Sequence, residues 1–277
     1  MNYVNPQQQH YENVHDDYGA HYYDASAMDY RREFVFRPLF AGLNLNGAHV
    51  ADLACGSGFN STLLREYYPE VKTDGFDISP RACEDYRRNL PGGNAYQCDL
   101  TQFYSAPRQY DAAMIFGGLH HCVMNLQQTL DNISGMIRPG GWLFMVEPNR
   151  RYILQTLRDF WYRNDRYFDA ATERALVHDE LLAMAPQFKL MDVKYYGGPA
   201  YFMILNSLIT RMPLKAKARL QTPLFAAEHV YNRLPGSDFS LYFRPVGIGC
   251  KFTANLQRAR HPASCFGGFP VAISRPP

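Results

Sequence analysis

The chain has 277 residues, of which 47% are hydrophobic and 19% charged, so it can bury a large core and is not a wholly disordered protein. Its formal net charge of +2 gives no electrostatic footprint for a nucleic acid or an anionic membrane. The six cysteines form no C-x-x-C pair, so a structural zinc site has no support. The polar N-terminus has no signal-peptide pattern, and free thiols fit a reducing compartment, so we expect a cytoplasmic protein.

Aromatic residues are numerous and unevenly spread, with 20 Tyr, 18 Phe and 2 Trp. Residues 1–40 hold nine of them and residues 151–250 hold sixteen, whereas the longer stretch 41–150 holds only twelve. We interpret the aromatic side chains of the two flanking segments as a wall around a substrate more than as a generic core.

The first 40 residues are predicted to form a helical, aromatic arm that Pro38 and the Gly42–Gly47 stretch close. Beyond it, apolar and amphipathic segments alternate, which predicts a parallel, doubly wound sheet. Ser79 and Pro80 occupy the N-cap and first-turn positions of one helix. The predicted strands are 49–54, 71–77, 95–98, 110–116 and 142–147, and the predicted helices are 59–68, 79–89 and 125–137, the last stopped by a turn at 138–141.

After residue 150 the alternation becomes looser. No apolar stretch reaches the roughly 18 residues that a membrane-spanning helix needs. The pattern predicts helices at 151–163 and 178–184, strands at 189–196 and 242–253, and inserted helices at 200–235 between those strands. We therefore divide the chain into an arm at 1–40, a main domain at 41–255 and a tail at 256–277.

A glycine-containing turn follows the first predicted strand, in the segment DLACGSG at 52–58. Such a turn, opening a helix, allows a ligand to approach the backbone closely. Asp77 and Asp99 end the next two strands, where carboxylates can accept a ribose hydroxyl or an adenine amine. The alternative is that Asp52 and Asp77 only cap loops and helices.

The segments DLACGSG, GFDIS, CDL, YDAAMIFGGLHH and RPGGWLFMVEPN, taken in this order over about residues 48–150, resemble the motifs of class I S-adenosylmethionine-dependent methyltransferases. The resemblance implies a Rossmann-like, seven-stranded, mostly parallel sheet with an antiparallel last strand. It implies S-adenosylmethionine as cofactor, S-adenosylhomocysteine as product, and no metal. The implied cofactor contacts are Asp52, Ala54, Cys55, Gly56, Gly58, Asp77, Ile78, Asp99, Leu100 and Phe116.

Two other functions remain as alternatives. A nicotinamide-dependent oxidoreductase would have the fingerprint G-x-G-x-x-G, which requires glycine at position 61, where this chain has Ser61. A non-catalytic cofactor-binding or scaffold protein could retain the same loop, and only activity measurements separate it from an enzyme.

The reacting groups are expected where the fourth and fifth strands end. His120 and His121 follow the fourth strand and Glu147 ends the fifth, so a histidine oriented by a carboxylate could act as general base. One histidine could instead close the loop and the other cap the following helix, while Glu147 could pair with Arg150 or Arg151.

The arm and the insertion are expected to close over the site. In this family an N-terminal arm commonly covers the cofactor, and the resemblance implies Tyr22 and Arg31 as contacts, Arg31 with the methionine carboxylate. The insertion at 200–235 is predicted to be a helical lid over a small, apolar or aromatic acceptor, as in secondary metabolism or quinone formation. A homodimer interface or a shallow membrane contact would use the same residues, and O-, N- and C-methylation all remain open.

Overall fold

A computed structural model describes residues 8, 19–150, 174–208, 210–233 and 247–254. The predicted helix at 151–163, the tail at 256–277, and most of the first 18 residues lie outside the described residues. Among the described residues, no helix combines the length and apolarity that crossing a membrane requires.

The strands form one sheet in the order β3-β2-β1-β4-β5-β7-β6. The first five in that order pair in parallel, which confirms the α/β, Rossmann-like core, and β7 pairs antiparallel with both β5 and β6. The order reverses between β1 and β4, whose carboxyl ends therefore border a crevice suited to ligands. The strands are β1 (His49–Leu53), β2 (Lys72–Asp77), β3 (Ala95–Gln97), β4 (Tyr110–Phe116), β5 (Ile137–Pro148), β6 (Phe188–Tyr196) and β7 (Gly247–Ala254).

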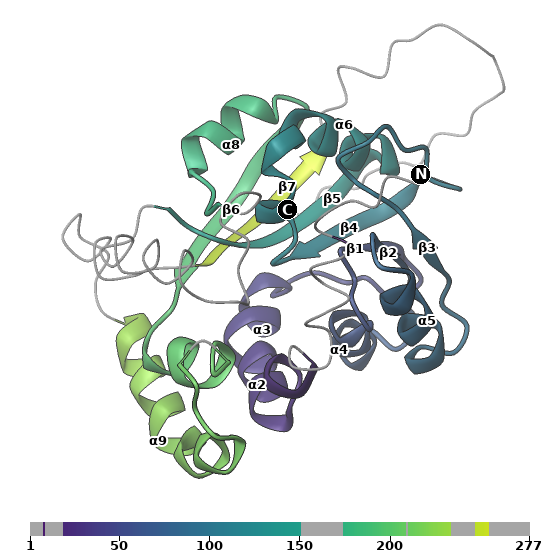
Figure 1. Cartoon of the computed structure of the whole chain (residues 1–277). Helices are drawn as coiled ribbons and strands as arrows, with labels where there is room; N and C mark the ends of the chain where they lie inside the picture. The colour runs from purple at the N-terminus through teal and green to yellow at the C-terminus, as the bar shows by residue number, and fades with distance from the viewer. Residues whose placement is uncertain (1–7, 9–18, 151–173, 209, 234–246, 255–277) are drawn as a thin grey trace, which may run out of the picture.

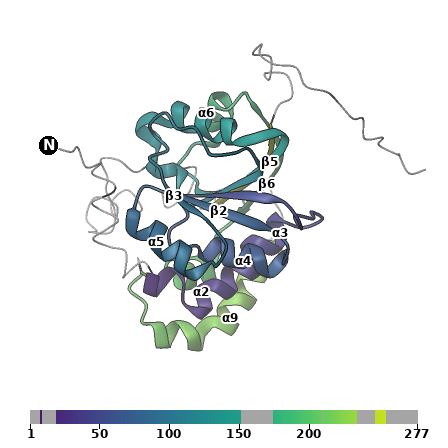
Figure 2. The same ribbon diagram turned by 90° about the vertical axis from the view of Figure 1, so that its right-hand side faces the viewer.

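Helices cover both faces of this sheet, and each face has its own core. One core joins the sheet to α6 (Leu126–Met136) and α8 (His178–Met184). The other joins it to the arm, α4 (Phe59–Tyr67) and the π-helix η4 (Tyr201–Leu205), on the side where α9 (Leu214–Arg233) also lies. Figures 1 and 2 show α6 on one side of the sheet and α2, α4 and α9 on the other.

Local sequence signals set several helix boundaries. Ser79 accepts a hydrogen bond from the Ala82 amide and Pro80 opens α5 (Pro80–Asn89), as predicted. The described part of the arm is helical, as α2 (Ala25–Tyr30), the π-helix η1 (Arg31–Phe36) and α3 (Arg37–Leu39). Asp24 caps α2 by accepting from the Ala27 amide at 2.8 Å.

The fifth strand begins earlier than predicted. β5 starts at Ile137, and its pairing with β4 jumps from Tyr110↔Ile137 to Ala112↔Trp142. The predicted turn at 138–141 is therefore an irregularity inside the strand. Gly141 packs so tightly there that an added Cβ would lie 2.6 Å from the carbonyl of Asp111.

Candidate functional site

The turn after β1 has left-handed backbone at three residues, and its two glycines serve different purposes: Gly58 allows close packing and Gly56 leaves space. Ala54, Gly56 and Gly58 have φ of 51°, 51° and 85°. A Cβ on Gly58 would lie 2.5 Å from Cδ1 of Leu90, so this glycine permits close packing of α4 on α5. Among the described residues, a Cβ on Gly56 would meet only the hydroxyl of Tyr23, at 3.9 Å. Gly56 therefore leaves space on the side of the turn that faces the arm.

Asp77 joins this turn to the one after β2. Its Oδ2 accepts from the Gly56 amide at 2.9 Å, and its Oδ1 accepts from the Ser79 amide at 2.9 Å. The loop-capping interpretation of Asp77 thus has geometric support. A carboxylate has about four acceptor sites, so the same group can also take a ribose hydroxyl. Ile78, beside it, is half-buried.

Asp52 lies beneath the turn rather than at its surface. Its side chain is 1% exposed and its Oδ2 accepts from the Ser61 hydroxyl at 2.7 Å. Ser61 in turn lies 2.9 Å from the hydroxyl of Tyr86. Burial raises the pKa of Asp52 to about 8. This network explains why residue 61 is serine, whereas a role for Asp52 as a direct cofactor contact stays a prediction.

The third predicted acid also stabilises a turn. Asp99 Oδ1 accepts from the amide of Thr101 at 2.9 Å and from its hydroxyl at 2.6 Å. Leu100 is buried in the same core as Phe76, and Cys55 is buried beneath the first turn. The structure thus brings the acids and their neighbours to consecutive strand ends, and their cofactor roles stay predictions.

The loop after β4 lies directly against the turn after β1, residues 54–58, which we call the cofactor loop after its predicted role. A Cβ on Gly118 would be only 2.5 Å from the Cβ of Ala54 and 3.0 Å from Cγ1 of Ile115. Phe116, at the strand end, packs edge-on against Phe36 of the arm, with ring centroids 5.4 Å apart. Whatever the cofactor loop holds is therefore close to the residues that follow Gly118.

Glu147 organises that loop from below. It is 1% exposed, and its Oε1 accepts from the amides of Gly118 and Leu119 at 2.9 and 2.7 Å. Its Oε2 accepts from the His120 amide at 3.2 Å and lies 2.8 Å from Nδ1 of the same residue. The His121 ring lies with its centroid 3.8 Å from that of His120. The structure brings all three predicted reacting residues together.

Part of the arm lies over the cofactor loop. The Tyr23 ring stacks on Phe59, at the start of α4, with centroids 4.3 Å apart. The Arg31 guanidinium lies 4.8 Å from the centre of the Tyr23 ring and donates a hydrogen bond to the Tyr22 carbonyl. Burial raises the pKa of Tyr23. Tyr23 is missing from the predicted cofactor contacts because nothing in the Tyr22-Tyr23 pair indicates which ring faces the loop.

The residues present suit the predicted cofactor. Gly56 leaves an open cradle, carboxylates end the second and third strands, and Tyr23 covers the turn. These groups match the backbone, hydroxyl and amine contacts that an adenosyl amino acid requires. Among the described residues, no cluster of three or more His, Cys, Asp or Glu side chains could hold a metal ion.

Comparisons with known proteins support this assignment. A family model described as a methyltransferase domain matches residues 50–141. A trans-aconitate 2-methyltransferase of Paracidovorax citrulli is 25% identical over 55% of this chain and 60% of that protein. A ubiquinone biosynthesis O-methyltransferase of Coxiella burnetii is 27% identical over 40% of this chain and 47% of that protein. Each match spans less than two thirds of the relative's length.

A solved structure shares the fold over more of the chain. The N-methyltransferase NodS from Bradyrhizobium japonicum WM9, in complex with S-adenosyl-L-homocysteine, is 12% identical, with a TM-score of 0.54 over 90% of this chain and 99% of that one. Residues 50–141 match a methyltransferase domain, and with the motif order and the strand-end acids this match supports a class I, S-adenosylmethionine-dependent methyltransferase.

Proposed function

We propose that the chain transfers a methyl group from S-adenosylmethionine to a small organic acceptor. The observation that carries this proposal is the contact between two loops. Gly118 packs on Ala54 of the cofactor loop, and the buried pair of His120 and Glu147 follows directly after it. A proton acceptor beside the loop that would hold the methyl donor suits methyl transfer to a group whose proton must leave before or during the attack.

The cofactor would be held by groups from three strand ends and the arm. The Gly56 backbone, Asp77 and Asp99 would take its methionine part, ribose and adenine, and Arg31 its carboxylate. The bound cofactor supplies an electrophilic methyl group on a sulfonium. The protein's contribution is then to align the acceptor and exclude water, and the Tyr23 ring over the loop suits the second task.

His120 is the proposed general base. Glu147 Oε1 is held by two backbone amides, so Oε2 is a fixed acceptor for Nδ1–H of the ring. In that tautomer Nε2 carries the free lone pair and takes the proton that the acceptor loses. Glu147 then stabilises the imidazolium. His121, whose ring lies beside that of His120 at an interplanar angle of 41°, is the alternative base, and a purely loop-shaping role for the pair is the alternative to both.

The proposed acceptor is apolar or aromatic. Tyr22, Tyr201 and Phe116 are half-buried aromatic side chains on the segments around the strand ends. The relatives named above act on trans-aconitate and in ubiquinone biosynthesis, so small acids and quinone precursors form the first acceptor panel. The lid role of the insertion and a cytoplasmic location are part of the same proposal.

The test has two stages. Calorimetry with S-adenosylhomocysteine measures binding, and transfer of a labelled methyl group is then measured over a panel of phenols, amines and carboxylic acids. Binding with turnover that His120→Ala abolishes and His121→Ala retains supports the full proposal. Binding without turnover of any acceptor favours the scaffold alternative. Absence of binding refutes the cofactor assignment.

A further inference from the structure

Helix α9 buries charged side chains. Among its residues, all of which the structure describes, Lys217 and Glu228 are the only fully buried ones, each at 0% exposure. Apolar side chains would normally occupy such positions, since a buried charge is costly unless it is paired and hydrogen-bonded. Two opposite buried charges on one helix therefore indicate specific partners.

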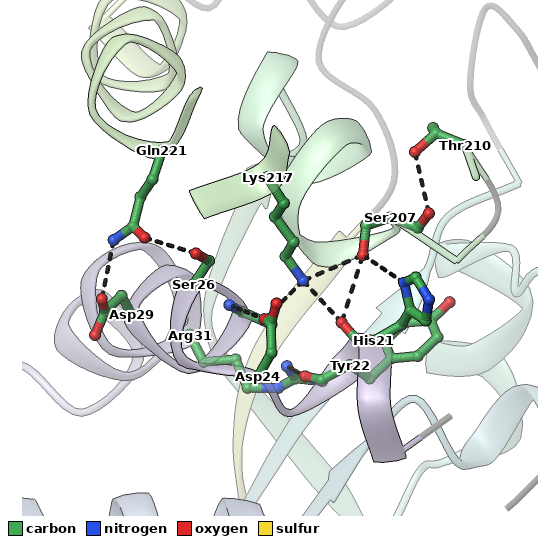
Figure 3. A network of polar contacts seen from close by, with 11 residues as sticks. His21, Tyr22, Asp24, Ser26, Asp29, Arg31, Ser207, Thr210, Lys217 and Gln221 are labelled. Carbon is green, nitrogen blue, oxygen red and sulfur yellow. Dashed lines mark hydrogen bonds and ion pairs between the residues drawn. The ribbon is translucent and has the colours of Figure 1, made fainter. Parts of the chain in front are cut away.

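Lys217 connects α9 to the residues that precede α2 (Figure 3). Its Nζ lies 2.7 Å from Oδ1 of Asp24, and it donates to the His21 carbonyl at 2.8 Å and to the Ser207 hydroxyl at 3.1 Å. An ammonium group has three N–H donors, and each has an acceptor here. Burial lowers the pKa of Lys217, and the Asp24 carboxylate opposes that shift.

Two more residues on the same face of α9, Gln221 and Glu228, form hydrogen bonds with α2. Gln221 donates to Oδ2 of Asp29 at 2.9 Å and accepts from the Ser26 hydroxyl at 2.7 Å (Figure 3). Glu228 accepts from the Tyr30 hydroxyl at 3.0 Å. At 3.6 residues per turn, positions 217, 221 and 228 fall within about 40° of one another around the helix. One stripe of α9 therefore holds α2 from its N-cap to its last residue.

Glu228 also connects α9 and α2 to the segment that follows β6. Its two carboxylate oxygens accept from the amides of Gly198 and Ala200, at 2.9 Å each, just beyond β6. The arm is thereby tied, through α9, to the main domain. Since the pairing partners are about 190 residues apart in the chain, these contacts set the position of the arm in a way that its own sequence cannot.

The two arm residues that Lys217 contacts, His21 and Asp24, lie on either side of the segment over the cofactor loop. They flank Tyr22 and Tyr23. The Tyr23 ring stacks on Phe59, and its hydroxyl would lie 3.9 Å from a Cβ added to Gly56. We propose that α9 is a clasp that holds the arm over the cofactor loop, with Lys217 as the positioning residue, so that affinity for the cofactor depends on the insertion. The inference rests on the proposed cofactor and assigns the insertion a second task beside that of a lid.

The test compares Lys217→Met with Lys215→Met, a matched change at an exposed position of the same helix. If losing the clasp leaves the arm closed in one tenth of the molecules, the apparent Kd for S-adenosylhomocysteine rises about tenfold. Calorimetry should then show a raised Kd at unchanged stoichiometry for Lys217→Met and no change for Lys215→Met. Hydrogen exchange should speed up at amides 19–31 while β1 and β4 stay protected.

A merely structural role for Lys217 would give a different result. It would lower the binding stoichiometry, because part of the protein would be unfolded, while the Kd of the folded fraction stayed at the wild-type value. Gln221→Ala, at a half-buried position, provides a milder second variant in case Lys217→Met fails to fold, with an expected rise of about twofold to threefold in Kd.

The outcomes separate the two proposals. A wild-type Kd in every variant that folds overturns the clasp and leaves the proposed function intact. A wild-type protein that does not bind S-adenosylhomocysteine overturns the proposed function first.

Discussion

Replacing Glu147 by glutamine tests the chemistry of the site with a change of one atom. The carboxylate accepts from the amides of Gly118 and Leu119 on one oxygen and faces the amide and Nδ1 of His120 on the other. A glutamine oxygen can keep the first two bonds. Its NH2 group must then point at His120, where the wild-type protein has an acceptor.

The structure gives two separate consequences. The His120 amide loses its acceptor in a buried site, which costs about 1–3 kcal/mol in the free energy of unfolding. The NH2 group of the new side chain donates to Nδ1, which moves the ring proton to Nε2. That nitrogen can then no longer accept a proton from the acceptor molecule. If His120 is the base, kcat falls by about 10²–10⁴.

The assay measures kcat at saturating S-adenosylmethionine together with the Kd for S-adenosylhomocysteine. Glu147→Gln should lower kcat by the stated factor, while the Kd changes little because the cofactor loop itself is intact. Glu70→Gln, at an exposed position, is the control and should match the wild type. A Glu147→Gln enzyme that keeps kcat within about threefold refutes the role of the pair in proton transfer.

Three further outcomes follow from the cofactor loop. Gly58→Ala should lower the free energy of unfolding by about 2–4 kcal/mol in urea titrations, because its φ is 85° and the new Cβ would meet Leu90 at 2.5 Å; a smaller loss would mean that α5 moves away. Asp77→Ala should raise the Kd for S-adenosylhomocysteine at least about tenfold, since it removes the proposed ribose contact and the acceptor for the Gly56 amide; an unchanged Kd in calorimetry contradicts the assignment. Asp52→Asn removes a group whose pKa burial raises to about 8 in the folded state, against 3.8 in the unfolded chain. Between these values the folded protein binds the extra proton, so wild-type stability falls as pH rises, and the stability of the variant relative to wild type should grow by up to about 1.4 kcal/mol per pH unit from pH 5 to pH 7. Parallel stability curves for the two proteins would exclude that titration.

Local signals made the central domain predictable. A Ser-Pro pair sets the start of α5, and a continuous apolar run at 112–116 indicates a strand buried on both faces, because both features act within a few residues. Glu147 and His120 were predicted to be adjacent because strands four and five are neighbours in class I methyltransferases, and the structure brings the two side chains within 2.8 Å. The irregularity at 138–141 escaped prediction, because Pro and Gly there indicate a turn whether or not the strand resumes around it.

Long-range pairs had no such signal. Lys217 looks like an exposed residue of a basic helix, as Lys215 is, and only the folded chain distinguishes the two. The choice of Tyr23 over Tyr22 as the ring above the loop depends on where Phe59 and Arg31 lie in space. Such choices are made by packing between segments far apart in the sequence, so a single sequence cannot contain them as a pattern.

Several described aromatic residues of the arm and the insertion have a packing role, while the substrate-wall interpretation of the others stays a prediction. In the arm, Tyr30 and Phe36 are fully buried, and Phe34 packs edge-on against Phe225 of α9 with ring centroids 5.1 Å apart. Among the described residues, Tyr30 and Phe34 of the arm and Phe225 of α9 thus belong to a core between the arm and the insertion.

The polar contacts of Lys217 and Glu228 fix the position of α9 along the arm. A shift of α9 by one turn, about 5.4 Å, would separate the Lys217 ammonium from Asp24 and the Glu228 carboxylate from Tyr30, and would leave both charges buried without these partners. Each of those losses is large compared with the loss of one aromatic contact. The aromatic contacts therefore hold the arm to the insertion, and the buried charges of Lys217 and Glu228 fix the position of the arm along α9, with Tyr23 above the cofactor loop.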